Sequence, residues 1–128
     1  MPQRIFAVLI TCFLGLGSAT AAEIELDWNS TEVGFFELSS DDGSVEHGVA
    51  VYVTSNRIAS EDDFHTIVPD FCANRLSQLL EFAAKMENAP IVSLLKLQLE
   101  FNGPKVGEHQ SYVARAATIR LENGECSL

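Results

Sequence analysis

The sequence predicts an α+β domain in which an antiparallel sheet of four to five strands carries one principal helix on one face. Three observations lead to this fold class. Segments with apolar residues at every second position, a pattern typical of half-buried strands, lie on both sides of a single long helical pattern. The connections between neighbouring strands are short, which favours antiparallel pairing. One cysteine lies in the helical stretch and another lies close to the C-terminus.

Residues 1–22 have the features of a secretory signal peptide. Arg4 precedes an unbroken apolar run, and small residues follow that run up to Ala22. The run is shorter than the roughly 20 apolar residues that span a bilayer, which argues against a membrane anchor. We therefore expect cleavage after Ala21 or Ala22. The remaining residues, 23–128, should form a single α+β domain in the periplasm or outside the cell.

Three strands are expected before the helix. Residues 23–28 alternate apolar and acidic side chains, which indicates a half-buried strand or an ordered N-terminal arm. A turn separates them from a second short strand at 33–38. A polar connection at 39–44 leads to the third strand, 45–54, in which valines recur at every second position. The β-branched content and strict alternation of this third segment make it a clear strand.

The helical pattern covers residues 60–86. Ser60 and the three carboxylates that follow it are typical of a helix start. Pro69 has no amide to donate to the preceding turn, so we expect a short turn at 62–67 and then a main helix with Pro69 in its first turn. Six residues at three- and four-residue spacing form its apolar stripe: Cys72, Leu76, Leu79, Leu80, Ala83 and Met86.

Two strands are expected after the helix, at 91–101 and 111–122. The first has the clearest alternation in the chain, and an Asn-Gly-Pro turn ends it. In the second, Arg115 shares its parity with inward-facing apolar residues, so it should lie at the sheet margin or pair with a carboxylate. The face opposite the helix would be solvated or used for contact, and it carries Glu46, Tyr52, Lys96, Gln98, Glu100, Thr118 and Arg120.

Two cysteines remain after removal of the signal peptide, Cys72 and Cys126. An even pair in a small exported domain is usually a disulfide, and we expect this pair to join the helix to the C-terminal segment. The alternatives are a metal pair or a redox couple. A redox couple usually has close spacing, and a metal site needs further ligands, so the structural bridge is preferred.

The net charge of −10 bears on partners rather than on the fold. Such acidity disfavours contact with nucleic acid or with anionic membrane surfaces. It serves solubility, or it attracts a basic envelope or secreted protein. In the second case the expected contact residues are the carboxylates of loops and the helix start, Asp41, Asp42, Glu61 and Asp62, because they lie outside the strands.

No constellation in the sequence indicates catalysis, and we expect no catalytic, cofactor-binding or metal-binding residues. The three histidines, His47, His65 and His109, are scattered and lack a partner at metal-ligand spacing. Residues 39–44 are acidic but lack the alternating oxygen ligands of a calcium loop. No serine stands in a G-x-S-x-G turn. The chain is therefore not expected to be an enzyme.

Three stretches support a resemblance: AVYVTSNRIA, FHTIVPDFCANRL and the closing GECSL. With a valine-rich strand ending in Arg-Ile-Ala, a helix cysteine and a cysteine near the C-terminus, the chain resembles small exported bacterial proteins of unknown function. The resemblance covers the second half of residues 23–128. It implies an exported location and a disulfide from the helix to the tail, and it brings no activity.

Two functions follow from these features. The first is a small exported protein-binding or accessory module that contacts another protein through its exposed sheet face. The alternative is an inhibitor or immunity protein that neutralises a basic toxin or hydrolase by presenting acidic loops to its cleft. Small size, export, one disulfide and acidity are compatible with both.

Overall fold

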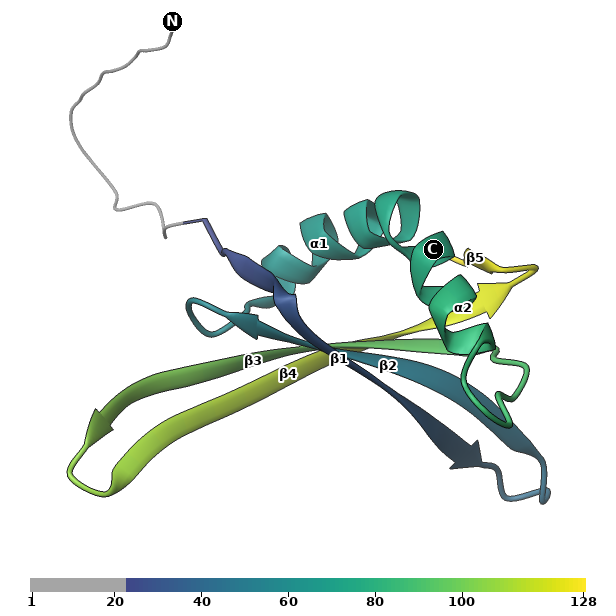
Figure 1. Cartoon of the computed structure of the whole chain (residues 1–128), viewed down its shortest axis with the longest axis horizontal. Helices are drawn as coiled ribbons and strands as arrows, with labels where there is room; N and C mark the ends of the chain where they lie inside the picture. Colours follow the sequence, from purple (N-terminus) through teal and green to yellow (C-terminus); the bar gives the residue numbers. More distant parts are fainter. Residues whose placement is uncertain (1–22) are drawn as a thin grey trace, which may run out of the picture.

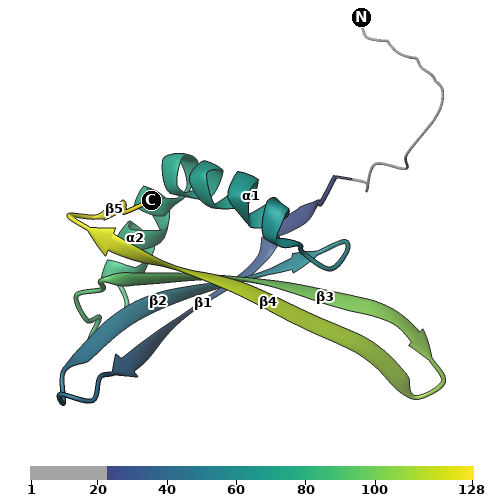
Figure 2. The same ribbon diagram turned by 180° about the vertical axis from the view of Figure 1, so that it is seen from behind.

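The computed structural model describes residues 23–128, so the predicted signal peptide lies outside the described residues. Within that part of the chain the fold is α+β, with one five-stranded sheet and two helices (Figures 1 and 2). The strands are β1 (Leu26–Ser39), β2 (Val45–Ser55), β3 (Leu94–Val106), β4 (His109–Glu122) and β5 (Glu125–Cys126). The helices are α1 (Glu61–Asn74) and α2 (Leu76–Ala84).

The sheet is mixed, with the strand order β1-β2-β3-β4-β5. The pairs β1–β2, β3–β4 and β4–β5 are antiparallel, whereas β2 and β3 run parallel. The expected purely antiparallel sheet is therefore wrong. The physical reason is the helical segment, which carries the chain from the end of β2 back to the start of β3 and so makes a crossover connection.

The strand β1 is longer than the sequence predicted. The expected strands at 23–28 and 33–38 belong largely to one continuous element, and the expected turn between them is an irregularity in the pairing with β2. The register moves from Asp27 opposite Thr54 to Glu32 opposite Tyr52. Three more residues are used on β1 than on β2 across this step, which makes it a bulge rather than a turn.

The helical segment is interrupted at Arg75 and not at Pro69, so the expected break was misplaced and there are two helices instead of one principal helix. Pro69 lies inside α1. Both Pro69 and His65 are exposed, so water can reach the His65 carbonyl that lacks its helical donor. Arg75 has φ −126° and places its guanidinium 4.0 Å from the centroid of the Trp28 ring.

The core lies between the helices and one face of the sheet (Figure 1). Its largest fully buried side chains alternate along the two parallel strands: Val49, Val51 and Val53 from β2, and Leu95, Leu97 and Leu99 from β3. No helix of residues 23–128 covers the other face of the sheet (Figure 2). The register places the seven predicted outer-face residues there.

The predicted disulfide is confirmed. The sulfur atoms of Cys72 and Cys126 lie 2.02 Å apart and join α1 to β5 across a sequence separation of 54 residues. This bond anchors the last segment of the chain beside the helices (Figure 1). A structural disulfide is typical of proteins in an oxidising compartment, which is consistent with export.

Candidate functional site

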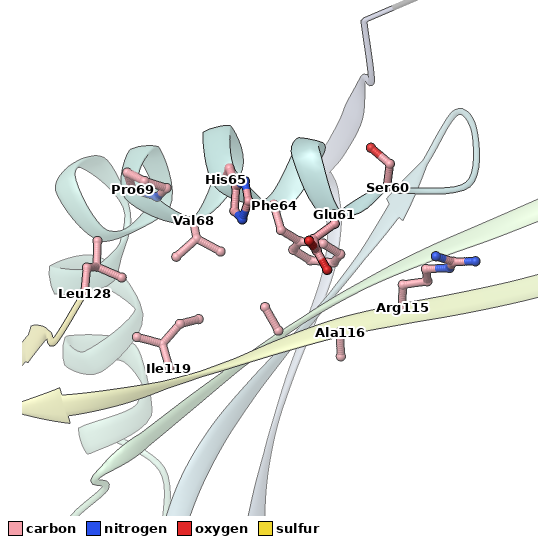
Figure 3. A pocket seen from close by; sticks show the side chains of 11 residues that line it. Ser60, Glu61, Phe64, His65, Val68, Pro69, Arg115, Ala116, Ile119 and Leu128 are labelled. Carbon is pink, nitrogen blue, oxygen red and sulfur yellow. The ribbon is translucent and has the colours of Figure 1, made fainter. Parts of the chain in front are cut away.

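A groove of about 660 Å³ lies between α1 and β4 (Figure 3). Phe64 and Val68 of α1 face Ile119 of β4 across it, and they give the groove an apolar floor. Charged or titratable side chains also line it: Glu61, His65 and Arg115. An apolar floor with a few polar groups is the usual composition of a binding site.

The helix wall of the groove is fixed by a capping box at the start of α1. The Ser60 hydroxyl accepts from the Asp63 amide at 3.2 Å, and the Asp63 carboxylate accepts from the Ser60 amide at 2.7 Å. Arg57 donates two hydrogen bonds to the same carboxylate, at 2.7 and 2.9 Å, and this guanidinium holds the pKa of Asp63 well below its usual range. The Asp63 carboxylate therefore stabilises the helix start, while Glu61 stays exposed.

The strand wall of the groove is the outer edge of the sheet. On its other side β4 pairs with β3 along most of its length. Outside it, β5 pairs only with Leu121 and Glu122, and the Ser127 amide donates to the Arg120 carbonyl at 2.8 Å. No described strand pairs with this edge of β4 before Arg120. The sheet therefore ends in a long open edge.

The backbone groups of Ala114, Ala116 and Thr118 point out from this edge. The Leu121 amide donates towards β3, to the Ser93 carbonyl at 2.8 Å, whereas the Arg120 carbonyl accepts from Ser127 on the opposite side. Backbone direction alternates along an antiparallel strand, so even-numbered residues face outwards. The three residues are exposed, and their outward N–H and C=O groups have no partner within residues 23–128.

Arg115 lines the groove and has no partner among residues 23–128. Its side chain shares the helix-side face of β4 with Ala117 and Ile119, which confirms the expected place at the sheet margin. Of the four arginines in the described chain, Arg115 alone makes no ion pair, hydrogen bond or ring contact. The others are engaged: Arg57 with Asp63, Arg75 with the Trp28 ring, and Arg120 with Glu46.

The four predicted contact carboxylates do not converge. Asp41 and Asp42 lie in the turn between β1 and β2, at one end of β2, whereas Glu61 and Asp62 follow its other end (Figure 1). Glu61 lines the groove, and Asp62 is exposed beside it. The Asp42 carboxylate accepts from the amide and the hydroxyl of Ser44, at 2.9 and 2.7 Å, and these bonds lower the pKa of Asp42. Asp42 therefore shapes its own turn.

On the uncovered face of the sheet, several polar side chains contact one another or aromatic rings of the same face. The Lys96 ammonium lies 5.5 Å from the Phe36 ring centroid and 5.8 Å from that of Tyr52. The Tyr112 hydroxyl donates to Glu100 at 2.8 Å, which raises the pKa of Tyr112. Lys96, Tyr112 and Glu100 are therefore engaged within this face.

The opposite edge of the sheet is a poorer candidate site. A smaller groove of about 280 Å³ lies beside β1, and Arg75 lies over the Trp28 ring within it. The bulge of β1 falls at residues 28–31, directly beside this groove. A bulge bends and twists an edge strand and so disrupts further pairing. The regular edge of β4 has no such irregularity on its own side.

Neither a metal cluster nor a membrane-spanning helix is found in residues 23–128. No group of three or more histidine, cysteine or acidic residues could hold a metal ion there, and no helix there is long and apolar enough to cross a bilayer. His65 borders the groove, whereas His47 lies on β2 and His109 at the start of β4.

Sequence reasoning placed Arg115 at the sheet margin or in a pair with a carboxylate, and it did not find the groove or the outward-facing backbone. The signal available in the sequence was the run of small residues around Arg115, because small side chains leave a strand open to the approach of another chain. No family model matches the chain, and neither a curated protein nor a solved structure is significantly similar to it. A functional argument therefore depends on the chemistry of the site itself.

Proposed function

We propose that this is an exported protein-binding module that holds an extended segment of another protein as an additional strand on the edge of β4. The observation that carries the proposal is the row of outward N–H and C=O groups at Ala114, Ala116 and Thr118, with an apolar groove beside it. In strand addition, main-chain hydrogen bonds provide affinity and the pockets for alternate side chains provide specificity.

The geometry divides the side chains of the added strand between two environments. Every second side chain would enter the groove between α1 and β4, where Phe64, Val68 and Ile119 can bury apolar groups. The other side chains would lie over the uncovered face beside Ala116. An accessory role in the periplasm or outside the cell is compatible with this arrangement, because one strand edge can serve a partner without any catalytic group.

A proline at the edge tests the proposal with little disturbance to the fold. Ala116→Pro removes one outward N–H and leaves the bonds between β4 and β3 in place. Glu37→Pro is the matched control on β1. The His47 backbone faces β3, and Glu37 pairs with His47, so the Glu37 amide points out from the opposite edge of the sheet.

The purified exported protein and both variants, checked for folding by circular dichroism, would be immobilised and exposed to envelope extract. We expect the unchanged protein and Glu37→Pro to capture the same partner and Ala116→Pro to lose it. Capture of the same partner by all three forms would refute strand addition on β4.

The inhibitor or immunity function is the second proposal. The exposed Asp41 at the tip of the β1–β2 hairpin and the net charge of −10 favour it. Asp41→Asn is the informative change, because Asp42 is used to hold the turn. A basic toxin or hydrolase steered by this hairpin should associate more slowly with the variant and with less dependence on salt. An association rate that changes neither with Asp41→Asn nor with the salt concentration would exclude this function.

A further inference from the structure

We infer that Arg115 selects the added strand: the segment carries a single carboxylate at the position facing Arg115 and an apolar side chain at the next groove-facing position towards Ile119. This inference rests on the proposed strand addition to β4, and it names the chemistry of the segment. Arg115 is then a specificity-determining residue of the site.

The first step concerns the free-energy cost of covering the Arg115 side chain with an added strand. Its side chain lies on the groove side of an edge strand, so a strand that adds beside it removes water from the guanidinium. A desolvated charge without a partner is strongly unfavourable. Charged side chains in such positions protect edge strands from indiscriminate pairing. A segment with a carboxylate at that position forms an ion pair with Arg115 instead. Arg115 therefore favours segments that carry the carboxylate and disfavours those that leave its charge unpaired.

The second step is the register that the edge allows. The Arg120 carbonyl is already bonded to Ser127, so β5 closes one end of the open edge. The pairing of β4 with β3 is regular only from Tyr112 onwards, because the register shifts just before it, so the free and regular stretch runs from Tyr112 to Thr118. At about 3.3 Å per residue this stretch accepts a segment of about seven residues. Arg115 lies at the middle of this stretch. The groove-facing position beyond it, next to Ala117, lies beside the buried side chains of Val68 and Ile119.

The third step concerns the acidic surroundings. Glu61 lines the same groove from α1, so a second carboxylate directed at the helix wall would be repelled. Glu61 is the one Asp or Glu of the described residues that lines the groove, and Asp62 beside it is fully exposed, where salt screens its charge with a Debye length of about 8 Å at physiological ionic strength. Contact with Arg115 therefore decides which side chain is preferred at the position facing it. The groove is expected to accept one carboxylate and not a run of them.

A phage-displayed library of random nonapeptides is the probe. It would be selected separately on the unchanged protein, Arg115→Glu, Lys105→Glu and Ala116→Pro. Lys105→Glu makes the same charge reversal at an exposed position of the β3–β4 hairpin, outside the lining of the groove. Binding constants of the selected peptides, measured by fluorescence anisotropy, and sedimentation of each protein form complete the experiment.

The expected result is that peptides selected on the unchanged protein share one Asp or Glu with an apolar residue two positions away. They should bind Arg115→Glu at least about tenfold more weakly, bind Lys105→Glu as before, and fail to bind Ala116→Pro. Selection on Arg115→Glu should return Lys or Arg at the same position.

Two results would overturn this inference but not the proposed function. In the first, the selected peptides fail to bind Ala116→Pro but share no carboxylate. In the second, they bind Arg115→Glu as tightly as the unchanged protein. Recovery of no peptide, or peptides that still bind Ala116→Pro, would refute the proposed function itself. Sedimentation that shows a dimer of the unchanged protein and a monomer of Ala116→Pro would also refute it, because a second copy of the chain would then occupy the edge.

Discussion

The ring of Phe36 lies over Gly48, its cross-strand partner, so closely that a Cβ atom at Gly48 would come within 2.2 Å of the ring. Gly48→Ala should therefore displace the ring and destabilise the fold by about 1–3 kcal/mol. Gly34→Ala is the control, because its added Cβ would meet Tyr52 at an ordinary 3.8 Å. Equal free energies of unfolding for the two variants in urea would contradict this packing.

The disulfide should contribute much of the stability. Replacing Cys72 and Cys126 by Ala removes the link between α1 and β5, and the typical cost in a small secreted domain is about 2–5 kcal/mol. Urea unfolding of the two forms measures the difference. The presence of free thiols in the unfolded, unreduced exported protein would show that the bond does not form.

The helix start should make stability depend on pH. In the folded protein the pKa of Asp63 lies below its ordinary value of 3.8, chiefly because of the hydrogen bonds from Arg57. The ionised carboxylate therefore stabilises the fold above that value, and the contribution is lost as the pH falls below it. Asp63→Asn should be less stable than the unchanged protein at neutral pH, and the difference should narrow between about pH 5 and about pH 2.

Asp62→Asn is the control for this experiment, because the Asp62 side chain is fully exposed and lies outside the capping box. Its free energy of unfolding should follow that of the unchanged protein through the same range of pH. A difference for Asp63→Asn that stays constant from neutral to acid pH would show that its carboxylate is not the titrating group.

Processing provides a separate prediction. The exported protein should begin at Ala22 or Glu23, because small residues precede this position and an apolar run precedes them. Intact-mass measurement of the protein from the periplasm or the medium identifies the first residue. A mass that includes residues 1–17 would contradict the signal peptide.

Much of the fold could be predicted from local patterns. The alternation of residues 45–54 and 91–101 corresponds to the buried rows of β2 and β3, because alternation reports directly on which side chains face the core. The pairing of Cys72 with Cys126 followed from there being two cysteines in residues 23–128. These features depend on neighbouring residues or on a simple count.

The rest depends on how elements are placed in three dimensions. The parallel pairing of β2 with β3 follows from the path of the crossover, which no local pattern records. The continuation of α1 through Pro69 depends on which side of the helix faces water. Arg115 could be placed near a margin, but its groove exists only because β4 ends the regular sheet beside α1.

Amide hydrogen exchange along β4 tests the central claim, that the edge receives an added strand, most directly. In the free protein the amides of Ala114, Ala116 and Thr118 should exchange much faster than those of Arg115 and Ala117, which face β3. With the captured partner or a selected peptide bound, the three fast amides should become protected. Saturated binding that leaves all three exchanging at their free rates would contradict strand addition at β4.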